Sequence, residues 1–288
     1  MSEKYEKPER VSVHGGHSGQ FCNHATDSLE EIVCAYIEYG FSWVGITEHM
    51  PPAGSQFIYP EERRAGLTVE LLRQRFAAYI REGRRLQEKY RHSLLCFVAM
   101  EIETCRGAHD LVDRLVEEFE PDYLVGSVHH VNDIPFDYSQ VEYDKAVRHA
   151  GGMDALYCRY FDEQFAMLQR FSPSVVGHFD LIRLFDPDYR KRLEKKEIAL
   201  RIERNLDFIK DNDLILDYNL RSLLKGADEP YVSRSILEMA LARGIAAVPG
   251  DDSHGVDSIG VNIDRGAALL QEYGFATIWR KPRLFRPK

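Results

Sequence analysis

Long hydrophobic runs are absent from this 288-residue sequence, and so is any surplus of basic residues. No apolar stretch approaches the roughly 20 residues that a membrane-spanning helix needs, so we expect no membrane span. Lys and Arg number 37 against 46 Asp and Glu, a formal net charge of −9. Proteins dedicated to nucleic acids are normally basic, so no nucleic-acid partner is expected. A small phosphorylated substrate is compatible with this charge, because bound metal ions supply local positive charge.

Cysteine is scarce and shows no pairing pattern. The five cysteines are odd in number and include no C-x-x-C motif, which favours a reducing compartment over a disulfide framework. Residues 1–10 alternate charges and lack the apolar core of a secretory signal. We therefore expect a cytoplasmic protein. No feature of the sequence indicates an oligomeric state.

A recurring order of apolar run, polar turn and amphipathic stretch indicates alternating strands and helices. The predicted strands are 11–13, 42–47, 94–100, 123–127, 175–176, 214–217 and 245–248. The predicted helices are 27–39, 68–91, 110–119, 154–170, 193–210, 232–243 and 259–273. Such a series without a linker favours a single α/β domain over residues 1–288, folded as a closed or nearly closed β/α barrel. A doubly wound open sheet is the competing architecture.

Histidines and carboxylates gather directly after the predicted strands. They are His14, His17, His49, Glu101, Glu103, His129, His178 and His254. The carboxyl ends of barrel strands converge on one rim, so these side chains should meet there. One such histidine is usually an ordinary polar residue, but this many at successive strand ends are hard to attribute to chance. Imidazoles and carboxylates together bind Mn, Fe or Zn, and their number predicts two or three divalent metal ions.

Six segments, taken together and in this order, resemble the polymerase-and-histidinol-phosphatase (PHP) family, in its histidinol-phosphatase branch. They are HGGHSGQFCNHA (14–25), GITEHMPP (45–52), AMEIET (99–104), VGSVHHVNDIPFD (125–137), VVGHFDL (175–181) and GDDSHGVDSIG (250–260). The resemblance implies a distorted (β/α)7 barrel of PHP type with up to three divalent metals. The metal ligands that it implies are His17, His24, His49, Glu103 (with Glu101 as the alternative), His129, His178, Asp252 and His254.

The opening motif departs from the family pattern. The family begins with H-x-H, whereas this sequence has H-x-x-H and places Gly15 at the expected ligand position. Neighbouring residues of a strand point to opposite faces, so His14 cannot simply replace it. We favour a bulge at Gly15-Gly16, which glycine permits and which makes His14 a ligand. The alternative is a metal position that lacks this ligand.

The resemblance and the ligand cluster predict hydrolysis of a small phosphomonoester by a metal-bridging hydroxide. The predicted catalytic residues are Asp252, His254, Glu103 and His178, and the candidate phosphate-binding residues are Arg183, Arg221 and Lys225. The expected substrate is L-histidinol phosphate, which would place the enzyme in histidine biosynthesis. Two alternatives stay open: a PHP phosphoesterase acting on nucleotides or other small phosphates, and a degenerate member that binds metal without turnover.

Several residues near the predicted ligands are expected to support the site without binding metal. Cys22 is expected to be a small buried filler inside the ligand segment. Asp180, Glu48 and Asp251 are expected to orient ligands through hydrogen bonds. The loop around 57–64 lies on the same rim and is a candidate lid.

Overall fold

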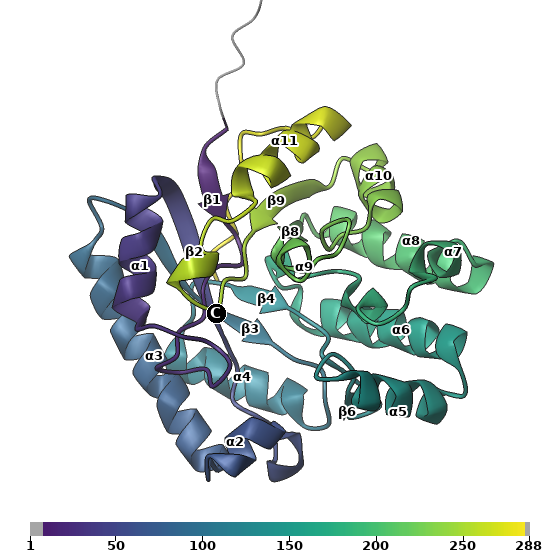
Figure 1. Cartoon of the computed structure of the whole chain (residues 1–288), viewed down its shortest axis with the longest axis horizontal. Coiled ribbons are helices and arrows are strands. Elements are labelled where there is room, and N and C mark those ends of the chain that lie inside the picture. Colours follow the sequence, from purple (N-terminus) through teal and green to yellow (C-terminus); the bar gives the residue numbers. More distant parts are fainter. Residues whose placement is uncertain (1–7, 286–288) are drawn as a thin grey trace, which may run out of the picture.

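Seven parallel strands form the centre of the molecule (Figure 1). The computed structural model describes residues 8–285; residues 1–7, which hold most of the charged amino-terminal segment, and 286–288 lie outside the described residues. The strands are β1 (Arg10–Ser12), β2 (Phe41–His49), β3 (Leu95–Ile102), β4 (Leu124–Gly126), β7 (Val175–Val176), β8 (Ile215–Asn219) and β9 (Ala246–Gly250). Their order in the sheet follows their order in the chain.

The two outer strands approach each other and nearly close the sheet. The backbone N–H of Val13 donates to the carbonyl of Pro249 at 2.9 Å, just beyond β1 and within β9. The N–H of Asp252 donates to the carbonyl of His14 at 2.8 Å. A doubly wound sheet would reverse its strand order at a switch point, and this one does not. The distorted (β/α)7 barrel is therefore confirmed, and the open-sheet alternative is wrong.

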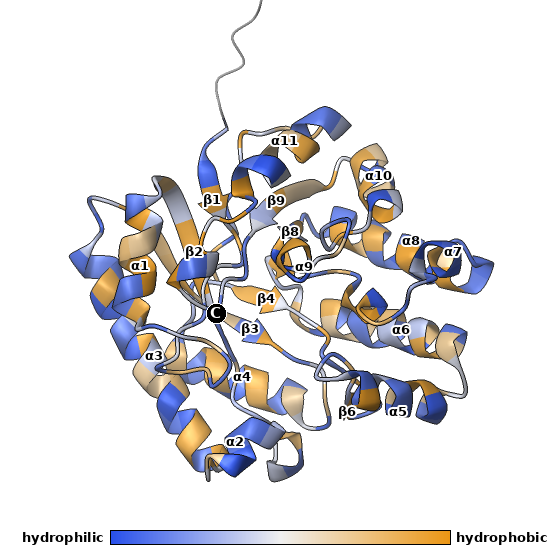
Figure 2. Cartoon of the chain, in the orientation of Figure 1, coloured by the Kyte–Doolittle hydropathy of each residue, from blue (hydrophilic) through white to orange (hydrophobic). Residues whose placement is uncertain are grey.

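Helices surround the strands on the outside (Figure 1). They are α1 (Leu29–Glu38), α2 (Pro60–Arg64), α3 (Val69–Lys89), α4 (Ala108–Phe119), α5 (Gln140–Ala150), α6 (Met153–Phe171), α7 (Tyr189–Leu193), α8 (Lys196–Asp211), α9 (Arg221–Leu224), α10 (Arg234–Ala242) and α11 (Ile263–Tyr273). Figure 2 shows hydrophobic and hydrophilic residues on different sides of these helices. That separation lets each helix bury one side against the barrel.

The first long helix illustrates how local sequence fixes an element. The Ser28 hydroxyl accepts the N–H of Glu31, and the Glu31 carboxylate accepts the N–H of Ser28 at 2.8 Å. This capping box satisfies two amide groups that the first turn leaves free, so α1 begins at Leu29. Ile32 and Tyr36, four residues apart, are both buried against the sheet.

The structure adds elements that the apolar pattern did not predict. Helices α2, α7 and α9 are five residues or fewer, too short to show a period, and α5 is largely polar. Only Tyr143, Ala146 and Ala150 of α5 are buried. The strands β5 (His130–Val131) and β6 (Ile134–Pro135) form an antiparallel hairpin beside the barrel rim. Among residues 8–285, no helix is long and apolar enough to cross a membrane.

Candidate metal centre

The ends of six barrel strands bring imidazoles and carboxylates to one place. His14 and His17 follow β1, His49 ends β2, and Glu101 lies near the end of β3. The other contributors follow β4, β7 and β9; they are His129, His178, Asp252 and His254. Because all these strands are parallel, their carboxyl ends share one rim.

Both opening histidines point into this centre despite their altered spacing. His14 Nδ1 lies 2.9 Å from Asp217 Oδ2, and His14 Nε2 lies 3.5 Å from Glu101 Oε2. His17 Nε2 lies 3.3 Å from Asp252 Oδ1. The chain between them is packed too tightly for a side chain, since a Cβ on Gly15 would lie 2.4 Å from the Gly45 carbonyl oxygen.

Gly15 and Gly16 are needed here because they lack a side chain, not because of an unusual backbone conformation. Neither Gly15 nor Gly16 has a positive φ, so neither adopts the left-handed conformation. The bulge predicted at Gly15-Gly16 is wrong, because the irregular register of β1 lies between Arg10 and Val11 and the strand ends at Ser12, before both glycines. The extra residue lies beyond the end of β1, where the N–H of Gly15 donates to the Gly45 carbonyl of β2 at 2.9 Å and leaves no room for a side chain.

Glu101 occupies the middle of the centre. Its Oε1 lies 3.1 Å from His129 Nε2 and 3.0 Å from His178 Nε2. Its Oε2 lies 2.9 Å from His49 Nδ1, in addition to the contact with His14. One carboxylate therefore contacts four imidazoles that come from four different strands.

Glu103, which the family resemblance ranks ahead of Glu101, lies at the edge of the centre. Its Oε2 is 3.4 Å from His130 Nδ1, and its carboxylate also approaches the ring nitrogens of His49 and His129. Both glutamates face the interior because they are two residues apart in an extended chain. The deeper of the two is Glu101, with 1% exposure against 9% for Glu103.

The predicted ligands fall into overlapping triads whose donor atoms lie within 4.8 Å of one another. The triads are His24, His49 and His254; His14, His17 and Asp252; His14, Glu101 and His178; and His49, Glu103 and His129. Every ligand predicted from the sequence belongs to at least one triad, and Glu101 joins them. A nitrogen-and-oxygen donor set of this kind suits Zn, Mn or Fe.

Buried ring nitrogens without hydrogen bonds also indicate a metal site. His178 Nδ1, His14 Nε2 and His17 Nε2 are shielded from solvent and make no hydrogen bond. Native proteins rarely leave buried polar atoms unsatisfied, and metal coordination would satisfy these. The residues present therefore fit a cluster of divalent metal ions.

Carboxylates control the charge of the deepest imidazoles. Burial by itself lowers the pKa of His14, but attraction from Glu101, Asp252 and Asp217 outweighs it and raises the pKa well above the ordinary value. Burial likewise opposes protonation of His17, yet the neighbouring carboxylates of Asp252 and Glu48 raise its pKa to about 9. This side of the centre consequently attracts cations, whether protons or metal ions.

The outer imidazoles behave in the opposite way. Partial desolvation in the site and the neighbouring rings of His49 and His17 lower the pKa of His24 to about 3. Burial and the His17 ring also lower the pKa of His254 well below its ordinary value. Both imidazoles are neutral at physiological pH and can donate a lone pair to a metal.

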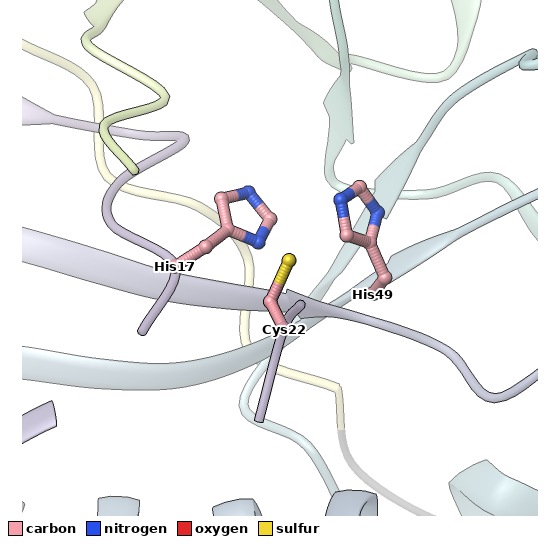
Figure 3. Close-up of side chains that lie close together, drawn as sticks. All are labelled: His17, Cys22 and His49. Atoms are coloured by element: carbon pink, nitrogen blue, oxygen red, sulfur yellow. The ribbon is translucent and has the colours of Figure 1, made fainter. Parts of the chain in front are cut away.

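Cys22 lies between two imidazoles of the centre (Figure 3). Its Sγ and a ring nitrogen each of His17 and His49 all lie within 4.8 Å of one another. Burial and the nearby Glu48 carboxylate raise the pKa of this thiol well above its ordinary value. Without a metal the thiol is protonated and a poor nucleophile, as expected of a buried filler.

Several supporting residues emerge only from the structure. Asp217 accepts a hydrogen bond from His14 Nδ1 and another from the backbone N–H of His178. Asp137 Oδ2 lies 2.7 Å from His129 Nδ1, which directs the other ring nitrogen at Glu101. A charged residue inside the apolar predicted strand 214–217 was the available signal for Asp217. Asp137 had no comparable signal.

The three residues expected to orient ligands differ in the groups that they contact. Glu48 Oε1 lies 3.2 Å from His17 Nδ1, in keeping with that role. Asp251 instead accepts hydrogen bonds from Tyr36 and Ser12. The prediction for Asp180 is wrong, because its carboxylate binds Ser233 and Arg183 and reaches no imidazole.

Two of the three predicted phosphate-binding residues border the cavity above the metal centre. Arg221 and Lys225 line this cavity together with His178 and Asp252, and Arg221 Nη1 donates to the Asp252 carbonyl at 2.8 Å. Arg183 is not among the lining residues.

Arg183 is committed to the protein interior. It is 5% exposed, contacts Asp180 at 3.2 Å and donates to the carbonyls of Glu229 and Pro230. Its guanidinium also lies over the ring of Tyr231, 4.5 Å from the centroid. The structure thus offers no access from Arg183 to a phosphate in the cavity.

Comparison with known proteins gives a consistent picture. The PHP domain family model matches residues 15–221. The "Probable histidinol-phosphatase" of Schizosaccharomyces pombe is 35% identical over 272 residues, which cover 93% of this chain and 88% of that protein. The histidinol-phosphatase of Saccharomyces cerevisiae is 31% identical over 286 residues, covering 88% of this chain and 85% of that protein.

Solved structures share the architecture. A candidate histidinol phosphatase of Listeria monocytogenes superposes with a TM-score of 0.76 and 25% identity, over 87% of this chain and 97% of that one. The histidinol phosphate phosphatase of Lactococcus lactis, solved with zinc, L-histidinol and phosphate, gives a TM-score of 0.70. That match covers 93% of this chain and 95% of the other, and at 17% identity it supports the fold alone.

Proposed function

This chain belongs to the PHP family, and from that premise we propose that it hydrolyses L-histidinol phosphate to L-histidinol and phosphate, a step of histidine biosynthesis. One observation carries the proposal: Glu101 contacts four imidazoles beneath a cavity that two basic side chains also line. Phosphate ester hydrolysis needs this combination, because charge on the phosphoryl oxygens must be neutralised as the ester bond breaks.

Two or three divalent ions, of Mn, Fe or Zn, would occupy the triads. Glu101 would hold ions together with the imidazoles on either side of it, because its two oxygens face different imidazole pairs. When bound, such ions supply a water of lowered pKa and draw charge from the phosphoryl oxygens. Oxygen and nitrogen donors of this kind hold all three candidate metals, so metal loading belongs in any assay.

The chain's own residues bind and orient the substrate. Arg221 and Lys225 would hold the phosphoryl group at the mouth of the cavity. The Arg221 guanidinium is already held by the Asp252 carbonyl, which fixes where its remaining N–H groups point. His178, Asp252 and His254 border the same cavity and would keep the phosphoryl group against the metal ligands.

Phosphate release from L-histidinol phosphate tests the proposal. Protein loaded separately with Mn, Fe and Zn would be assayed beside a panel of nucleotides and sugar phosphates. A strong preference for L-histidinol phosphate is the expected result. Activity confined to nucleotides or sugar phosphates would keep the phosphatase chemistry and reject the pathway. Metal-loaded protein that is silent on the whole panel would favour the non-catalytic alternative.

Site variants connect any activity to this centre. His178→Ala and Asp252→Ala should abolish phosphate release, while circular dichroism and thermal melting show a folded protein. Near wild-type turnover in both variants would refute the proposed site. Asp207→Asn is the matched control, because this exposed carboxylate pairs with Arg243 and is not among the residues that line the cavity.

A further inference from the structure

The cavity above the metal centre has an acidic and aromatic side that phosphate binding does not use. Glu61 from α2 and Asp137, which follows β6, both line the cavity. Tyr59 and Tyr138 line it beside them. In Figure 1, α2 and β6 lie in the lower part of the view and α9, which carries Arg221, lies above the centre. The cavity is therefore bordered on one side by the carboxylates of Glu61 and Asp137. Arg221, in α9, and Lys225, directly after it, border the cavity with positive charge.

Each carboxylate keeps one oxygen without a partner. Glu61 Oε2 and Asp137 Oδ1 are both shielded from solvent and make no hydrogen bond, although both side chains border the cavity. The second oxygen of Asp137 is occupied by His129 Nδ1 at 2.7 Å. A shielded carboxylate oxygen is costly unless a donor meets it, so a cationic donor in the cavity would stabilise this arrangement.

The tyrosines complete a surface suited to a cation. The rings of Tyr59 and Tyr138 have centroids 5.8 Å apart and are tilted by 32°. Ring faces attract ammonium groups and stack with planar heterocycles. Tyr138 is 37% exposed, so its ring is accessible at the mouth of the cavity.

We propose that Glu61 and Asp137, with the rings of Tyr59 and Tyr138, bind the cationic part of the substrate's leaving group. The ligand class is a phosphate monoester of an amino alcohol, whose ammonium and imidazole would face this side while its phosphoryl group faces Arg221 and Lys225. This inference rests on the proposed function and identifies the residues that would select its substrate. The metal ligands determine the hydrolytic step, whereas these four residues determine which alcohol is released.

Glu61 is the residue to change, because Asp137 also orients a metal ligand. Glu61→Gln keeps the shape and removes the charge, and Glu70→Gln, on the exposed face of α3, is the matched control. For each protein, kcat/KM would be measured with L-histidinol phosphate, O-phosphoethanolamine and ethyl phosphate. The last two have similar size and differ in the ammonium group.

A loss of discrimination is the expected result. In Glu61→Gln, kcat/KM for each cationic ester should fall relative to ethyl phosphate by about 10- to 100-fold, the range for a hydrogen bond to a charged group. Glu61→Asp should restore part of the ratio, and Glu70→Gln should leave it unchanged. Bound metal, measured by elemental analysis, should stay at the wild-type amount.

Other outcomes separate this inference from the proposed function. An equal fall for cationic and neutral esters, or no fall at all, would overturn the assignment of Glu61. If the wild type ignores L-histidinol phosphate, the proposed function fails. The ratio of phosphoethanolamine to ethyl phosphate then still decides the subsite, because it depends only on the ammonium group.

Discussion

Asp217 Oδ2 lies 2.9 Å from His14 Nδ1, and this contact turns the opposite nitrogen of His14 toward Glu101. The carboxylate fixes both the tautomer and the orientation of an imidazole whose position in the sequence departs from the family pattern. Partners of this kind behind metal-ligating histidines strengthen metal binding.

Replacing Asp217 with Asn should therefore weaken metal binding without removing a ligand. We expect metal affinity to fall by about 10- to 100-fold, as for other carboxylates behind ligating histidines. Titration of metal-free protein with Mn or Zn would measure it, with Asp207→Asn as the control. Unchanged affinity in Asp217→Asn would show that His14 needs no support or is not a ligand.

Substitutions of Glu101, in β3, and of Glu103, directly after β3, should reduce activity to very different extents. Glu101→Gln should lower kcat by on the order of 10²- to 10³-fold, since Glu101 is the shared contact of four imidazoles. Glu103→Gln should have a smaller effect, because Glu103 lies at the edge of the centre. Steady-state kinetics and metal content of the two variants measured together test this order. The reverse order would return the central role to Glu103.

Gly15, between His14 and His17, should not tolerate replacement by a residue with a side chain. Gly15→Ala would place a Cβ 2.4 Å from the Gly45 carbonyl oxygen and 2.7 Å from Val44 Cγ2. Overpacking of this kind costs about 1–3 kcal/mol, so we expect a lower midpoint of unfolding and less bound metal. In the control Gly54→Ala the new Cβ meets only the flexible end of Gln56. A stable, fully metal-loaded Gly15→Ala protein would contradict this account.

Glu163 should make stability depend on pH. Burial raises the pKa of Glu163 to about 7, although its carboxylate accepts the backbone N–H of Asn132 at 2.9 Å. Between its unfolded pKa near 4.5 and about 7, the folded state holds the proton more tightly, so stability declines as pH rises through this window.

Glu163→Gln should remove that decline. Relative to wild type, the variant should gain on the order of 1 kcal/mol at pH 8 and little or nothing at pH 4.5. Urea unfolding at the two pH values measures the difference, with the exposed Glu238→Gln as the control. An equal change at both pH values would mean that the proton on Glu163 is not responsible.

Much of the architecture follows from local sequence. All seven barrel strands were predicted to within a few residues. Each is a short apolar run bounded by polar turns, which is the pattern of a buried strand. The rim position of the histidines follows from the parallel order. The elements that escaped prediction, such as α5 and the β5–β6 hairpin, bury too few side chains to leave a periodic pattern.

What the sequence determined by itself is the set of donor types and the rim at which they gather, because strand alternation and order along the chain are local properties. The tertiary structure alone decided that Glu101 lies deeper than Glu103 and that His14 turns inward. It also decided that Arg183 is bound to Asp180 rather than facing the cavity. Depth, close approach and pairing depend on residues from distant strands, and no local pattern encodes those distances.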